Sequence, residues 1–196
     1  ATISGGDTGG GTGGGTGGAA GDIELTVGNP FTGEVFDDLT GTAGDDNFHA
    51  ESGTFTSGDK INGGAGNDTL TFINEEFDVA VNARVTGVEN FIVTNQVNDN
   101  NNGSNNNIDN FNQDVEIDAG RMLGTTRWEN YDSRADVIIE DARDIESNDN
   151  DTQDSDGTFT GDQTVAMVST DQGNVDYAVY FDDPQATSNN NDSIFI

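Results

Sequence analysis

One nine-residue segment, Gly63-Gly-Ala-Gly-Asn-Asp-Thr-Leu-Thr71, constrains the fold of this chain more than any other feature. It fits the nonapeptide template Gly-Gly-x-Gly-x-Asp-x-apolar-x at every fixed position. The segment Gly41-Thr-Ala-Gly-Asp-Asp-Asn-Phe-His49, which begins 22 residues earlier, fits with one departure, because Thr42 replaces the second glycine. Two copies of so specific a pattern predict a stack of similar turns.

Two weaker copies precede these matches by nine residues each. The segment 54–62 has Asp59 at the sixth position, and the segment 32–40 has Asp37 there. Each aspartate is followed two residues later by an apolar residue, although neither segment has the glycines. The four copies together form two units, each made of two nonapeptides.

The template gives each residue type a physical role. The glycines allow a tight turn whose carbonyl oxygens point inward, and the sixth-position aspartate supplies a carboxylate. Stacked turns are expected to bring Asp37 near Asp59 and Asp46 near Asp68. About six oxygen atoms from two neighbouring turns would then surround a Ca²⁺ ion, which takes six to eight oxygen ligands.

The charge of the chain narrows its partners. The 196 residues include 37 acidic and 6 basic side chains, for a formal net charge of −31. This charge repels nucleic acid and anionic membrane surfaces. The sequence contains no run of 18 apolar residues, so it predicts no segment that inserts into a membrane. The absence of cysteine and the single histidine, His49, argue against disulfides, most zinc or haem sites and histidine-dependent catalysis.

The same charge creates a folding problem. Hydrophobic residues make up only 31% of the chain, so repulsion between carboxylates must be offset from outside the chain. Bound divalent cations would do this, and so would bulk salt, as in proteins adapted to high salinity. The placement of the aspartates at matched template positions favours bound cations.

The composition also divides the chain. Residues 1–21 are nearly all Gly, Thr and Ala and are expected to form a linker or an assembly arm. Residues 22–196 are expected to form a single all-β domain, with calcium-binding repeats at 32–71. The Asn-rich stretch 95–112 and the Asp-rich stretch 147–157 are interpreted as surface loops. The whole chain is expected to be a segment or a processed piece of a longer protein.

Short β-branched and aromatic runs, including 69–73, 135–139 and 175–181, predict strands, and no stretch keeps a helical period. The run centres Leu70, Ile92, Ile117 and Ile138 are 22, 25 and 21 residues apart, which predicts one layer of a stack per repeat. The runs 164–170 and 175–181 flank the four-residue connection Asp171-Gln-Gly-Asn174 and predict an antiparallel hairpin.

On these motifs the sequence resembles the haemolysin-type, or repeats-in-toxin (RTX), calcium-binding proteins over residues 32–71. A looser similarity links Val85-Thr-Gly-Val-Glu-Asn-Phe-Ile-Val-Thr94 to repeats of bacterial surface-layer and adhesin-like proteins. The resemblance implies a parallel β-roll or β-solenoid that folds when Ca²⁺ fills its turns. It also implies secretion by a one-step type I route to the extracellular space or cell surface. The expected fold is therefore all-β, a calcium-binding roll that continues into further β layers and ends in the antiparallel hairpin.

From the template and the resemblance we expect Ca²⁺ as the only cofactor and a structural, non-enzymatic role in a surface layer, adhesin or extracellular filament. The expected partners are identical or neighbouring repeats and cell-surface glycans. The expected metal-site residues are Asp37, Gly41, Ala43, Asp45, Asp46, Asp59, Gly63, Ala65, Asn67 and Asp68.

Three alternatives remain open. The chain could be a β-helical polysaccharide lyase or hydrolase in which Ca²⁺ and arginine neutralise substrate carboxylates. It could be a glycan-binding module in which Trp128 and Tyr131 form a stacking platform, although buried strand-edge aromatics are the simpler interpretation. The acidic run 149–156 has the spacing of a calcium loop but lacks a glutamate at the twelfth position, which favours a solvated loop.

Overall fold

The computed structural model describes residues 21–27, 36–97, 114–142, 163–168, 175–181 and 194–195. All regular structure in these ranges is β-strand, which confirms the all-β prediction. The described residues contain no helix that could cross a membrane. The predicted N-terminal linker (apart from Gly21) and the acidic run 149–156 lie outside the described residues.

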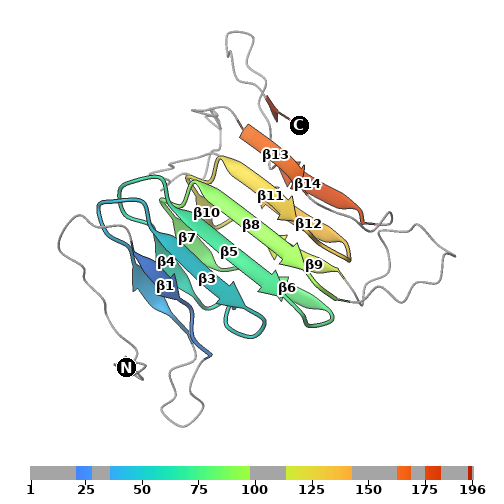
Figure 1. Ribbon diagram of the computed structural model, residues 1–196, viewed down its shortest axis with the longest axis horizontal. Helices are drawn as coiled ribbons and strands as arrows, with labels where there is room; N and C mark the ends of the chain where they lie inside the picture. The colour runs from blue at the N-terminus through green and yellow to red at the C-terminus, as the bar shows by residue number, and fades with distance from the viewer. Residues whose placement is uncertain are drawn as a thin grey trace, which may run out of the picture.

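The strands form three sheets in which every pairing is parallel (Figure 1). The seven-stranded sheet has the order β1 (Asp22–Glu24), β3 (Asn47–Glu51), β5 (Thr69–Asn74), β8 (Asn90–Asn95), β11 (Arg127–Tyr131), β13 (Gln163–Val168) and β15 (Ile194–Phe195). The second sheet has the order β10 (Met122–Leu123), β7 (Arg84–Thr86), β4 (Lys60–Asn62) and β2 (Asp38–Thr40). The third sheet has the order β14 (Tyr177–Phe181), β12 (Val137–Ala142), β9 (Val115–Asp118) and β6 (Val79–Val81).

Successive strands of the chain belong to different sheets. Between β2 and β5 the chain alternates between the second and the seven-stranded sheet. From β5 to β12 it passes through the third, the second and the seven-stranded sheet in turn. Strands that pair are therefore one full circuit apart: 22 residues separate Asp46 from Asp68, whereas 37 separate Thr94 from Tyr131.

The predicted regular spacing is only partly correct. Leu70 and Ile92 lie on β5 and β8, which pair in the seven-stranded sheet, and Ile117 and Ile138 lie on β9 and β12, which pair in the third sheet. Ile92 and Ile117 belong to different sheets, so their separation is not a repeat length. The distance from one strand of the seven-stranded sheet to the next grows from 21 residues between Thr69 and Asn90 to 37 residues between Asn90 and Arg127. A step of 25 residues from Ile92 therefore ends in β9 of the third sheet and does not reach β11.

The predicted C-terminal antiparallel hairpin is wrong. β13 lies in the seven-stranded sheet, parallel to β11 and β15, and β14 lies in the third sheet, parallel to β12. The connection 171–174 lies outside the described residues. The two strands each continue an existing sheet, where their apolar side chains extend columns that are already buried.

The core consists of columns in which residues from successive strands stack in register. Phe48, Leu70, Phe91 and Trp128 form one such column, and each of their side chains is fully buried. Phe55 packs beside it, with its ring centroid 5.2 Å from that of Phe72 and 6.2 Å from that of Phe91. Along β3 buried apolar residues alternate with exposed or half-buried polar ones because one face of the strand is covered, whereas β8 and β11 also bury polar residues such as Thr94, Glu129 and Asn130.

The carboxyl ends of β5 and β8 are joined by buried asparagines. Nδ2 of Asn74 donates to Oδ1 of Asn95 (3.1 Å) and to the carbonyl of Glu76 (2.8 Å). Asn95 in turn donates from Nδ2 to the carbonyl of Asp136 (2.9 Å) and from its backbone to Oγ of Ser133 (2.8 Å). Asn95 was predicted to begin a surface loop, but it is the last residue of β8 and is fully buried.

Candidate metal centre

Two columns of residues precede the strands where the template places its aspartates. The first, called here the Asp46 column, lies one residue before the strands β1, β3, β5, β8 and β11 of the seven-stranded sheet and continues into the first residue of β13. Sheet register aligns its members in the order Gly21, Asp46, Asp68, Glu89, Thr126 and Gln163. The second, the Asp37 column, precedes the strands of the second sheet in the order Asp37, Asp59, Ala83 and Gly120.

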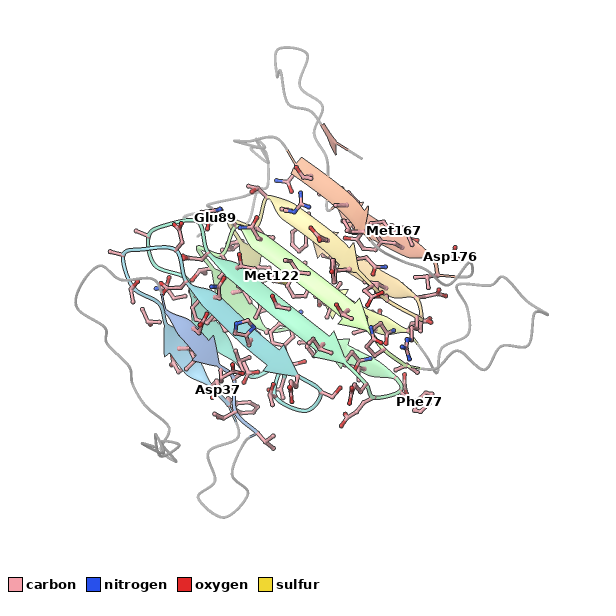
Figure 2. All side chains as sticks on the ribbon, viewed as in Figure 1. Asp37, Phe77, Glu89, Met122, Met167 and Asp176 are labelled. Carbon is pink, nitrogen blue, oxygen red and sulfur yellow. The ribbon has the colours of Figure 1, made fainter. Side chains whose placement is uncertain are left out.

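The structure brings together the two predicted pairs. The backbone N–H of Asp46 donates to Oδ1 of Asp68 (2.7 Å), and the backbone N–H of Asp37 donates to Oδ1 of Asp59 (2.9 Å). The two pairs belong to separate columns that serve different sheets. In Figure 2, Asp37 of one column and Glu89 of the other are accordingly labelled well apart.

Two glycines of the template are required by close backbone approach. A Cβ added to Gly63 would overlap the carbonyl oxygen of Gly87 and Oδ2 of Asp68. A Cβ added to Gly41 would overlap the carbonyl oxygen of Gly63 and would also lie 2.6 Å from Oδ2 of Asp46. In each turn a carboxylate oxygen and a carbonyl oxygen of the next turn therefore flank the space beside a glycine Cα, where only a residue without a Cβ fits.

The two template copies differ at their second position. Thr42 donates to Oδ2 of Asp46 from its backbone N–H (2.5 Å) and from its hydroxyl (3.0 Å). Gly64 occupies the equivalent place in the second copy with φ +103, and its N–H donates to Oδ1 of Asn62 (3.2 Å). Oδ2 of Asp68 consequently has no hydrogen-bond partner, although Asp68 is fully buried.

Burial disfavours the charged form of the inner aspartates. It raises the pKa of the Asp68 carboxyl above its ordinary value, against the hydrogen bond from Asp46, and the negative charges of Glu89 and Asp46 raise it further. Burial also raises the pKa of Asp59, against the hydrogen bonds from the Thr56 and Asp37 N–H groups. A cation bound beside either carboxyl would offset this penalty on the charged form.

The other predicted ligands have different surroundings. Ala43, Asp45, Ala65 and Asn67 are exposed at the tips of the turns. Oδ1 of Asp45 accepts a hydrogen bond from the backbone N–H of Asn67 (2.8 Å), so this pair also joins neighbouring turns. Within the described ranges, no group of three or more histidine, aspartate or glutamate side chains is arranged to hold a metal. A cation in these turns would therefore depend on carbonyl oxygens and water as well as on one or two carboxylates.

Glu89 is not among the metal-site residues predicted from the sequence. Its Oε2 accepts a hydrogen bond from the backbone N–H of Asp68 (2.7 Å), the same contact that Asp68 makes to Asp46. No glycine template surrounds Glu89, but its position 21 residues after Asp68 was a detectable signal.

The glycan platform of Trp128 and Tyr131 is not formed. Trp128 is fully buried and donates from Nε1 to Oε1 of Gln163 (2.9 Å), whereas Tyr131 is 45% exposed on the outer side of the same strand. Arg127 is paired with Glu129, two residues along the strand.

Comparison of the chain with models of protein families, with curated proteins and with solved structures found no match in any of the three.

Proposed function

We propose that this chain is a calcium-stabilised, non-catalytic segment of a secreted structural protein, of the kind that forms a surface layer, an adhesin or an extracellular filament. Its three parallel sheets form a β-roll that continues as a β-solenoid, related to the haemolysin-type repeats by its two glycine-aspartate turns. The parallel pairing of strands one circuit apart supports this architecture.

One observation carries the calcium proposal. Asp68 is fully buried, its Oδ2 has no partner, and a carbonyl oxygen of the next turn flanks the same space. A buried carboxylate oxygen without a donor is costly, and a hard cation is the partner that carboxylate and carbonyl oxygens bind in common.

The cation acts on folding and assembly in this proposal. An extracellular site filled at about ten times its Kd adds about 1.4 kcal/mol to the free energy of unfolding. That is a substantial part of the roughly 5–15 kcal/mol that stabilises a typical domain. Calcium also reduces the repulsion that a net charge of −31 imposes on association between copies.

The test is chelation. Circular dichroism and sedimentation velocity of the full chain are measured in millimolar CaCl₂, in EGTA, and in EGTA with molar NaCl. We expect EGTA to weaken self-association and to reduce, without abolishing, the β-structure signal, and CaCl₂ to restore both. Rescue by molar NaCl as readily as by millimolar CaCl₂ would favour adaptation to high salinity, and an unchanged fold in EGTA would contradict the proposal.

A further inference from the structure

The Asp46 column continues past the glycine template. Glu89 stands one strand beyond Asp68, on the turn that leads into β8. Its carboxylate accepts the Asp68 N–H as the Asp68 carboxylate accepts the Asp46 N–H. Glu89 therefore performs the structural role of a template aspartate without the template.

The two steps of this column differ in what the carboxylates contact. At Asp46, Thr42 supplies donors to Oδ2 from its backbone and its hydroxyl. At Asp68, Oδ2 has no partner and shares the space beside Gly63 with the carbonyl oxygen of Gly87, two residues before Glu89. The unmet demand for a positive partner therefore lies between Asp68 and Glu89.

Among the residues that the structure describes, no basic side chain meets this demand. The ion pairs within this part of the chain are Lys60–Asp38 and Arg127–Glu129, with His49–Asp22 as a third only when the imidazole is protonated, and none of them reaches Asp68 or Glu89. The next members of the column, Thr126 and Gln163, are neutral, so Glu89 is the last carboxylate among the described members of the column.

Resting on the calcium binding proposed above, we propose that the chain holds a calcium site between Asp68 and Glu89, with Glu89 as a ligand that the glycine template does not include. The oxygen ligands of the ion are Oδ2 of Asp68, the carboxylate of Glu89, the carbonyl of Gly87 and water. This donor set suits calcium, which accepts mixed carboxylate, carbonyl and water ligands in flexible geometry. The site lies one turn further along the chain than the predicted bridge between Asp46 and Asp68.

The test is isothermal titration of the full chain with CaCl₂. Glu89→Gln keeps an oxygen to accept the Asp68 N–H but removes the charge, and Glu51→Gln removes the same charge from an exposed position on β3. We expect Glu89→Gln to weaken the tightest site at least tenfold and Glu51→Gln to change it less than twofold. Equal affinity in wild type and Glu89→Gln would overturn the assignment while leaving calcium binding intact. A wild-type chain that takes up no calcium would instead overturn the function on which it rests.

A measurement on the wild-type chain covers the case in which Glu89→Gln does not fold. The carboxyl ¹³C resonances of Asp68 and Glu89 are followed by NMR as CaCl₂ is added. We expect both to shift with the same midpoint, and a Glu89 resonance that stays constant while Asp68 shifts would overturn the assignment.

Discussion

The Thr42 N–H and hydroxyl both donate to Oδ2 of Asp46, at 2.5 and 3.0 Å. The equivalent turn has Gly64 in place of Thr42 and leaves Oδ2 of Asp68 without a partner. The carboxylate of one template copy is thus satisfied by its own chain, whereas the carboxylate of the other keeps an oxygen without a hydrogen-bond partner. The departure of the first copy from the template explains the difference.

Thr42→Gly is expected to convert the first turn to the state of the second. The variant loses the hydroxyl bond to a carboxylate, worth about 1.5–3 kcal/mol. Urea unfolding in EGTA should therefore show a free energy of unfolding lower by about 1–3 kcal/mol, and titration with CaCl₂ should show an added or tighter site.

Thr40→Gly is the control, because Thr40 is an exposed residue of β2 and its loss should cost only the strand preference, up to about 1 kcal/mol. If both variants lose the same stability and bind calcium as wild type does, Thr42 has no special role at Asp46.

The raised pKa of Asp68 predicts how stability depends on pH without calcium. The folded state binds the Asp68 proton more tightly than the unfolded state does, where the pKa is near 3.8. The free energy of unfolding in EGTA should therefore rise as the pH falls through the pKa that Asp68 has in the folded state. The full gain should be present below pH 3.8.

Asp68→Asn isolates this contribution from the other carboxylates. It should be more stable than wild type in EGTA at pH 7, should gain less on acidification, and should be stabilised less by CaCl₂. Urea denaturation at several pH values measures all three. A variant with the pH profile of wild type would show that the Asp68 carboxyl titrates normally.

The aspartate pairs were predictable because they depend on a local template repeated at a fixed offset of 22 residues. Glu89 was harder to find, because its equivalence to Asp68 depends on the pairing of Thr69 with Asn90 at a step of 21 residues and on no motif. The antiparallel hairpin failed for a related reason. A Gly-containing connection indicates a turn, but only the register of distant strands decides which sheet β13 and β14 join.

The change from acidic to neutral residues along each column predicts where the proposed calcium acts. The acids are Asp37 and Asp59 in one column and Asp46, Asp68 and Glu89 in the other. The members that follow them in each column carry no charge: Ala83 and Gly120 in the first, Thr126 and Gln163 in the second. In EGTA, hydrogen exchange measured by mass spectrometry should become at least tenfold faster in β2–β5 and change little in β9–β12. A uniform loss of protection would mean that the described sheets unfold as one cooperative unit.

Asn95 is expected to support the fold independently of calcium. Its side chain is fully buried, accepts from Asn74 (3.1 Å) and from the Val97 N–H (3.3 Å), and donates to the carbonyl of Asp136 (2.9 Å). Asn95→Leu leaves several buried groups without partners, which should lower the free energy of unfolding by about 2–4 kcal/mol. Because the asparagines lie at the opposite strand ends from the aspartate columns, the loss should be the same in CaCl₂ and in EGTA.

Asn47→Ala is the control. It changes an exposed position of β3 and should cost less than about 0.5 kcal/mol, as surface changes usually do. Urea unfolding of both variants under the two conditions measures these values, and an Asn95→Leu loss confined to EGTA would show that the two strand ends are coupled.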